Sequence, residues 1–226
     1  KAEQDGWLKH YMVRHEQGGS HAADGYARAT GKPGVVLVTS GPGATNAITG
    51  IATAFMDSIP MIVISGQVQS HLIGSDAFQE TDMIGVSRPI VKHSFTVDKQ
   101  ENIARIIKEA FHIATSGRQG PVVIDVPKDL TNPDDLFDFN YPSKANIRSY
   151  NPPTKPENHQ VARAVDAILA AERPVIYAGG GTIASNASDE LRELNELIDF
   201  PVTNTLMGLG VYPGTGKRFL GMLGMH

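Results

Sequence analysis

The chain contains no cysteine among its 226 residues, which excludes disulfide bonds, thiolate metal sites and a cysteine nucleophile. It also has no apolar run near the ~20 residues that a membrane-spanning helix needs. No basic block is present, the formal net charge is −4 and the sequence pI is about 6.1. We therefore expect neither nucleic acid nor a membrane as a partner.

The two ends of the sequence lack several ordinary features. There is no initiator methionine, and the first residues lack the basic head and apolar core of a signal peptide. The last residues, 221–226, carry no helix-capping pattern. We expect the chain to be a fragment of a longer protein, cut at both ends.

Short apolar runs alternate with helix-like stretches along the first 130 residues. The runs at 34–38 and 61–64 are apolar over their whole length, which is typical of parallel strands covered on both faces. The pattern predicts an α/β fold with a doubly wound, mostly parallel sheet. The expected strands are 10–14, 34–39, 60–65, 89–97 and 121–127, and the expected helices are 17–30, 43–56 and 100–116. Residues 67–88 are too long for a simple turn and indicate a functional loop.

A change of composition divides the chain. Five prolines lie among polar residues within 131–156, which is typical of a linker. The α/β alternation then resumes over 157–226 and predicts part of a second, Rossmann-like domain. Its expected helices are 157–171 and 187–198, and its expected strands are 173–178 and 200–203.

Four polar or glycine-rich segments follow expected strands, and ligands bind at that edge of a doubly wound sheet. They are Arg14–Gln17, Ser40–Asn46, Asp76–Glu80 and Pro127–Asp129. Each alone has an ordinary explanation, as a helix cap, a turn or a surface charge.

In this order, however, the segments resemble a known family. Residues 14–16 (Arg-His-Glu), 23–31 and 39–46 resemble the pyrimidine-binding domain of thiamine-diphosphate enzymes that act on 2-keto acids. Residues 56–60, 65–68, 76–83, 92–95, 117–121, 127–129 and 206–210 are similar to acetohydroxyacid (acetolactate) synthase catalytic subunits. The resemblance makes residues 1–130 the pyrimidine-binding domain without its N-terminal part, and 157–226 the start of the FAD-associated central domain.

The resemblance implies a reaction and its partners. The expected enzyme decarboxylates pyruvate and joins the product to a second 2-keto acid, giving 2-acetolactate, or 2-aceto-2-hydroxybutyrate from 2-ketobutyrate. These compounds belong to branched-chain amino-acid biosynthesis (isoleucine, valine and leucine). The implied cofactors are thiamine diphosphate, FAD and Mg²⁺, and the implied assembly is a homodimer or larger with a possible regulatory small subunit. The expected location is the cytoplasm, or a plastid or mitochondrion in a eukaryote.

The resemblance also assigns roles in the thiamine site. Glu16 is the expected catalytic acid, which bonds N1′ of the aminopyrimidine and promotes loss of the C2 proton. Burial is expected to raise its pKa. His15, Pro42, Gly43 and Asn46 are the expected cofactor-binding residues around it.

Three residues are similar to those that line the substrate channel of the synthases: Phe78, Gln79 and Lys128. Lys128 is expected to attract an anionic keto acid, and Phe78 to supply an apolar wall. Position 69 is Gln, where many plant and fungal relatives have a proline associated with herbicide sensitivity.

The FAD contacts implied by the resemblance are spread along the chain. They are Arg118, Gly179, Gly180, Gly181, Thr205, Leu206, Met207, Gly224, Met225 and His226. The glycines follow an expected strand, where backbone amides suit a diphosphate, but their spacing is not the G-x-G-x-x-G pattern. No metal ligand is expected in this chain, because the family's Gly-Asp-Gly…Asn motif for Mg²⁺ does not occur in it. The fragment is therefore expected to be inactive by itself.

Two alternatives remain open from the sequence. The first is another thiamine-diphosphate enzyme, such as a pyruvate oxidase or a carboligase for a different keto acid. The second is a non-catalytic nucleotide-binding regulatory module.

Overall fold

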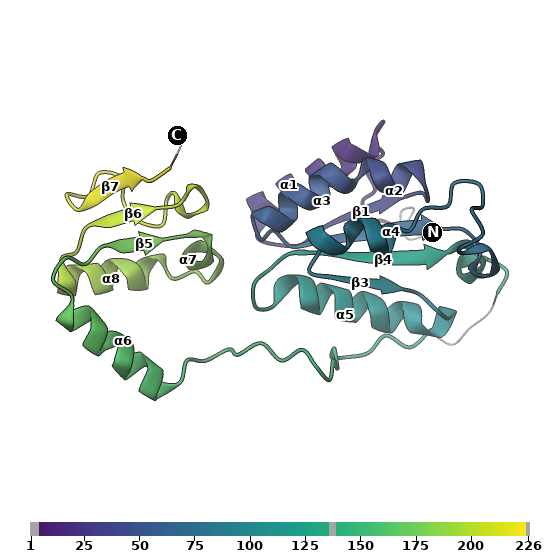
Figure 1. Cartoon of the computed structure of the whole chain (residues 1–226). Helices are drawn as coiled ribbons and strands as arrows, with labels where there is room; N and C mark the ends of the chain where they lie inside the picture. Colours follow the sequence, from purple (N-terminus) through teal and green to yellow (C-terminus); the bar gives the residue numbers. More distant parts are fainter. Residues whose placement is uncertain (1–4, 136–138, 225–226) are drawn as a thin grey trace. The chain divides into compact units, whose positions relative to one another are not determined.

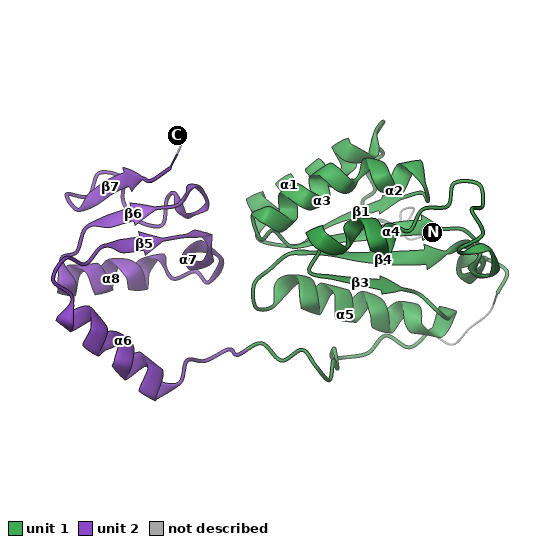
Figure 2. Cartoon of the chain, viewed as in Figure 1, with its two compact units in different colours: residues 1–152 green, residues 153–226 purple. Residues whose placement is uncertain are grey.

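The computed structural model describes residues 5–135 and 139–224 of the chain. By its internal contacts the chain divides into two units, residues 1–152 and residues 153–226 (Figure 2). Within the described residues, no helix is both long enough and apolar enough to cross a lipid bilayer.

Unit 1 is built on a sheet of four parallel strands in the order β1-β2-β4-β3 (Figure 1). The strands are β1 (Gly34–Val38), β2 (Met61–Gln67), β3 (His93–Thr96) and β4 (Pro121–Pro127). The α-helices are α1 (Glu16–Thr30), α2 (Pro42–Asn46), α3 (Ile48–Met56), α4 (Met83–Ser87) and α5 (Ile103–Thr115). Short 3₁₀ turns are η1 (Ser70–Leu72), η2 (Arg88–Ile90), η3 (Gln100–Asn102) and η4 (Lys128–Thr131).

Helices cover both faces of this sheet, as the continuous apolar runs of β2 and β4 predict. On one face, α5 packs its buried side chains against Ile62, Val122 and Ile124. The opposite face bears α1, α3 and α4. The predicted doubly wound, mostly parallel α/β fold is confirmed for this unit.

The edge strand β1 departs from the expectation that every apolar run is covered on both faces. Val36 and Val38 are buried, but Val35 is 52% exposed and Leu37 73% exposed. The register places Val35 beside Ile62, on the α5 face. Since α5 packs against β2, β3 and β4, this face of β1 stays open.

The expected strand at 10–14 is wrong. These residues form no strand, and Tyr11 and Met12 are 80% and 87% exposed. A strand needs a neighbouring strand to take its backbone hydrogen bonds. Among the described residues β1 is an edge strand that pairs with β2 alone, so residues 10–14 do not pair with its outer edge.

Other boundaries also shift. The expected helix 43–56 is two helices, because Ala47 N–H bonds Ala44 O, only three residues back, at 3.2 Å. Residues 88–90 form the turn η2, so the strand expected over 89–97 shortens to β3.

The proline-rich segment is partly attached to unit 1. Ile147 and Tyr150 pack against the α5 cluster. Tyr150 Oη donates to Ser116 O at 2.9 Å, and Lys92 Nζ lies 5.1 Å from the centre of the Tyr150 ring. The structural division falls after Pro152, inside the expected linker.

Unit 2 is a second parallel α/β unit with the strand order β5-β6-β7. Its strands are β5 (Ile176–Ala178), β6 (Val202–Asn204) and β7 (Phe219–Met222). Its helical elements are α6 (Asn158–Ala170), α7 (Gly180–Ala184), α8 (Ser188–Ile198) and the 3₁₀ turn η5 (Leu206–Gly208). Two elements were not expected from the sequence: α7, which is short and glycine-rich, and β7, which contains Gly221 at a φ of 86°.

Candidate functional site

The predicted thiamine-site residues meet at the carboxyl edge of the unit 1 sheet. The helix α1 runs toward the amino end of β1, so its first residue, Glu16, lies at the opposite edge. The segments that follow β1, β2 and β4 leave from the same edge, because the strands are parallel. This edge therefore collects four segments that are far apart in the sequence.

Glu16 and Asn46 bond each other across 30 positions of the sequence. Asn46 Nδ2 donates to Glu16 Oε2 at 3.1 Å. His15 caps α1, since its Nδ1 accepts from Gln17 N at 3.1 Å. The structure thus brings together the predicted catalytic acid and two of the predicted cofactor-binding residues.

The expectation that burial raises the pKa of Glu16 does not hold in this chain. The pKa of Glu16 is lowered from its ordinary value of 4.5, chiefly because Asn46 donates a hydrogen bond to the carboxylate. The backbone N–H of Glu16 at the start of α1 adds to this effect, and the opposing effect of burial is smaller. Glu16 is therefore an ionised hydrogen-bond acceptor at neutral pH.

The Gly41-Pro42-Gly43 turn forms the wall beside Glu16. Pro42 begins α2, where its missing N–H costs nothing. A Cβ at Gly43 would lie 2.6 Å from Thr39 Cγ2 and 3.3 Å from Glu16 Oε1. Glycine at position 43 therefore lets the turn approach the Thr39 side chain and the Glu16 carboxylate closely.

The segment with Phe78 and Gln79 is held in a strained course. Asp76 and Gln79 have φ values of 57° and 59°, in the left-handed region. The Glu80 carboxylate accepts hydrogen bonds from the backbone N–H of Gly74 and of Ala77, and these bonds lower its pKa. The same segment presents Phe78 to solvent, 88% exposed.

This segment lies directly against the glycine turn. Gly41 has a φ of 60°, and a Cβ there would lie 2.6 Å from Gln79 O. The predicted channel residue Gln79 therefore lies next to the turn that contains Pro42 and Gly43, two of the predicted cofactor-binding residues.

Lys128 lies just after β4, in η4, and its side chain is exposed. The next residue, Asp129, accepts from Ser70 N at 2.8 Å and from Ser70 Oγ at 3.1 Å. These bonds join the turn that carries Lys128 to the turn η1, which precedes Phe78 in the chain. All three predicted channel residues thus belong to segments at one edge.

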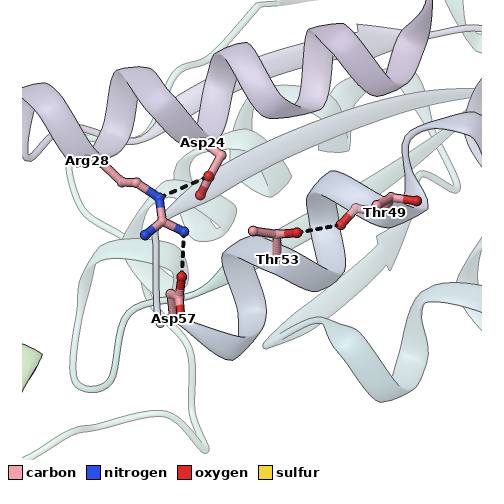
Figure 3. Close-up of polar contacts among 5 residues, drawn as sticks. All are labelled: Asp24, Arg28, Thr49, Thr53 and Asp57. Atoms are coloured by element: carbon pink, nitrogen blue, oxygen red, sulfur yellow. Dashed lines mark hydrogen bonds and ion pairs between the residues drawn. The ribbon is translucent and has the colours of Figure 1, made fainter. Parts of the chain in front are cut away.

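The other end of α1 is fixed by an arginine. Arg28 Nε donates to Asp24 at 2.9 Å, and Arg28 Nη2 donates to Asp57 at 2.7 Å (Figure 3). Asp57 caps the end of α3, where Thr53 also bonds back to Thr49 O at 2.9 Å. The bond to Asp57 joins the last turn of α1 to the end of α3, whereas the bond to Asp24 lies within α1.

Arg118, a predicted FAD contact, lies at the opposite edge of the sheet. Its Nε donates to Ser58 Oγ at 2.8 Å. Ser58 and Arg118 precede β2 and β4, so they lie at the amino ends of these strands. The structure does not bring Arg118 together with Glu16.

In unit 2, the predicted FAD residues that follow β5 and β6 do meet. Thr205 N donates to Ala178 O at 3.0 Å, and a Cβ on Gly180 would lie 3.0 Å from Met207 Cβ. Gly179 caps α7 and Gly181 lies inside it, while Leu206 is 64% exposed. Gly224 follows β7 and is exposed, and Met225 and His226 lie outside the described residues.

The residue before Thr205 was not predicted. Asn204 is fully buried at the end of β6, and neither its Oδ1 nor its Nδ2 has a hydrogen-bond partner. Gln67 and Asp125 were missed in unit 1, where they hydrogen-bond at 3.0 Å in the sheet. The available signal was a polar side chain, Asp125, within the apolar run of β4.

Over residues 5–135 and 139–224, no three His, Asp or Glu side chains converge on a point that could hold a cation.

Two domain families match this sequence. Residues 2–86 match the family described as "Thiamine pyrophosphate enzyme, N-terminal TPP binding domain". Residues 161–226 match "Thiamine pyrophosphate enzyme, central domain". The matches fall one in each structural unit.

Individual relatives agree with these matches. The chain is 63% identical over 221 residues to an "Acetolactate synthase large subunit" of Buchnera aphidicola, and 57% identical to that of Haemophilus influenzae. It is 56% identical to the "Acetolactate synthase isozyme 3 large subunit" of Escherichia coli. Each alignment covers 98% of this chain but only 38–39% of the relative. The chain belongs to the thiamine pyrophosphate enzymes, and over nearly its whole length it is homologous to acetolactate synthase large subunits.

Proposed function

We propose that this chain forms the part of an acetolactate synthase that activates thiamine diphosphate and receives the 2-keto acid. The reaction would convert two pyruvates to 2-acetolactate, or pyruvate and 2-ketobutyrate to 2-aceto-2-hydroxybutyrate. The observation that carries the proposal is the Glu16–Asn46 pair beside the glycine wall, in a chain whose relatives are named for this activity.

The residues at this edge fit thiamine diphosphate. The Glu16 carboxylate, held by Asn46, can accept a hydrogen bond from a ring nitrogen, and the glycine at position 43 brings the backbone of the turn close to that carboxylate. When bound, the cofactor supplies the carbon nucleophile that attacks the keto group. Glu16, held by Asn46 and ionised, would hold a proton at the ring nitrogen N1′ by accepting its hydrogen bond.

The other residues at this edge would serve the substrate. Lys128 would attract the carboxylate of the keto acid, because an exposed ammonium raises the local concentration of anions. Phe78 would supply an apolar wall that excludes water from the reacting groups.

Unit 2 fits a polar ligand such as FAD. The buried Asn204 amide has no partner, and burying such a group unpaired costs free energy that a ligand's polar atoms would recover. Gly179, Gly180, Thr205 and Met207 surround the same strand ends. Mg²⁺ stays a prediction of the resemblance, with no ligand expected in this chain, and we assign it no step here.

The partners follow from the same proposal. The relatives are named large subunits, which implies a smaller companion subunit, and pyruvate is the implied substrate. A homodimer or larger assembly, and a cytoplasmic location (or a plastid or mitochondrion in a eukaryote), stay predictions.

The test uses the complete gene product with thiamine diphosphate, Mg²⁺ and FAD. Acetolactate formed from pyruvate is measured for the wild type and for Glu16→Gln, with Gln160→Glu as a control on the exposed surface of α6. We expect acetolactate from the wild type and a loss of at least ~100-fold in Glu16→Gln, the scale of a positioned proton-transfer group. Acetaldehyde or acetyl phosphate as the wild-type product would show a different thiamine-diphosphate reaction, and a fully active Glu16→Gln would refute the role of Glu16.

A further inference from the structure

One buried side chain bonds both ends of the loop that carries Phe78 and Gln79. Gln67 is the last residue of β2 and only 6% exposed. Its Oε1 accepts from Val68 N at 2.8 Å, at the first residue of the 68–81 loop. Its Nε2 donates to Thr81 O at 2.8 Å, at the last residue of the same loop.

Asp125 fixes the orientation of this amide. Gln67 Nε2 also donates to Asp125 Oδ2 at 3.0 Å, between neighbouring strands β2 and β4. Thr81 O and the ionised Asp125 carboxylate only accept, and Val68 N can only donate, so a single orientation of the amide satisfies all three. The carboxylate thereby makes the flipped orientation, with Oε1 toward Thr81 and Asp125, unfavourable.

The 68–81 loop depends on its ends for its course over the site. Its middle has left-handed backbone at the non-glycine residues Asp76 and Gln79, a conformation that costs energy and is kept only when the surroundings enforce it. The loop main chain at Gln79 then lies against Gly41, next to the thiamine wall. A change at the loop ends therefore moves Gln79 and Phe78 relative to Glu16.

We propose that Gln67 is a positioning residue for the keto-acid substrate, and that Asp125 holds Gln67 in its working orientation. The inference rests on the proposed function of this edge of the sheet. Gln67 is buried beneath the loop and acts on the substrate through Phe78 and Gln79.

The first test is Gln67→Met in the complete gene product with thiamine diphosphate, Mg²⁺ and FAD. Met has a similar length but neither donates nor accepts these bonds. We expect the KM for pyruvate to rise about 10-fold, because only a fraction of the molecules then holds the loop in its competent position. The concentration of thiamine diphosphate needed for half-activation should change by less than about 2-fold, because Glu16 and Asn46 are untouched. Gln160→Met, on the exposed surface of α6, is the matched control.

A second variant separates loop positioning from sheet stability. The exchange Gln67→Glu with Asp125→Asn restores an amide–carboxylate bond between β2 and β4 and keeps an acceptor for Val68 N. It leaves Thr81 O without its donor. Unlike Gln67→Met, this double variant should have the wild-type melting temperature, but its KM for pyruvate should stay raised.

Hydrogen exchange of the peptide covering residues 68–82 gives a readout that needs no activity. Hydrogen exchange of this peptide should be about 10-fold faster in Gln67→Met and in the double variant Gln67→Glu/Asp125→Asn than in Gln160→Met. If the wild type makes no acetolactate, the proposed function fails while hydrogen exchange still tests the clamp. The inference would be overturned by a wild-type KM in Gln67→Met or in the double variant Gln67→Glu/Asp125→Asn, or by an unchanged rate of hydrogen exchange in this peptide.

Discussion

A methyl group at Gly41 should disturb both the fold and the site, because two separate costs meet there. Gly41 has a φ of 60° and a ψ of −117°, a conformation that a residue with a side chain adopts only at a cost of about 1–3 kcal/mol. The new Cβ would also lie 2.6 Å from Gln79 O and 2.9 Å from Gln79 C. Both contacts are to backbone, so the loop itself must move, and overpacking of this kind costs about 1–3 kcal/mol more.

Gly74→Ala is the control for the first cost. Gly74, in the 68–81 loop that also contains Gln79, has a φ of 86°, but a Cβ there would meet nothing within 4 Å. Gly74→Ala should therefore carry backbone strain alone, and Gly41→Ala strain plus the collision with Gln79. In thermal unfolding of the complete gene product, Gly41→Ala should melt several degrees below Gly74→Ala, at ~2–4 °C per kcal/mol for a unit of this size. It should also raise the KM for pyruvate, whereas Gly74→Ala should change the KM less. Equal melting temperatures and equal KM values for the two variants would refute the contact between the loop and the glycine turn.

Three further predictions concern stability. Arg28→Met should lower the free energy of unfolding by ~1–3 kcal/mol in denaturant titration, because the nearly buried Asp24 carboxylate loses its charged partner; an unchanged midpoint would contradict this. Burial raises the pKa of Asp125 from 3.8 to about 6, so its contribution favours folding below pH 3.8 and is lost as the pH rises through about 6. Asp125→Asn should thus be the more stable form above pH 6, by at most about 3 kcal/mol, and a stability difference that does not change between pH 4 and 7 would refute it. Tyr150→Phe should cost ~0.5–1.5 kcal/mol through the lost bond to Ser116 O, and thermal unfolding that matches the wild type would show that the bond contributes nothing.

The sequence predicted the parts of the fold that depend on local pattern. The apolar runs of β2 and β4 and the helical spacing of α5 appear where they were expected, because burial on one face or on both fixes these patterns. The strand at 10–14 was wrong although Tyr11, Met12 and Val13 have strand-like side chains. Whether such residues pair depends on a neighbouring strand, and a local pattern carries no information on that neighbour.

The proximity of two predicted site residues could be expected from the sequence, but the pKa shift of Glu16 could not. The resemblance named Glu16 and Asn46, and the structure places them in hydrogen-bond contact. Burial was expected to raise the pKa of Glu16, whereas the hydrogen bond from the Asn46 amide stabilises the charged form and lowers this pKa. The sign of this pKa shift depends on a hydrogen-bond donor 30 residues away in the sequence. The sequence alone does not show that the donor and the carboxylate are in contact in the folded chain.

The 68–81 loop shows why a buried acid is worth its cost in this sheet. Asp125 is 3% exposed, its Oδ1 has no partner, and an apolar side chain in β4 would avoid that loss. A leucine at this position, however, would leave Gln67 Nε2 with Thr81 O alone and would lower the penalty for flipping the amide. A flipped amide would set its oxygen against Thr81 O and its NH₂ against Val68 N–H, and so release both ends of the loop. Burying Asp125 therefore costs free energy, but its carboxylate orients Gln67 and so favours one arrangement of the 68–81 loop. The left-handed residues of this loop would not maintain that arrangement by themselves.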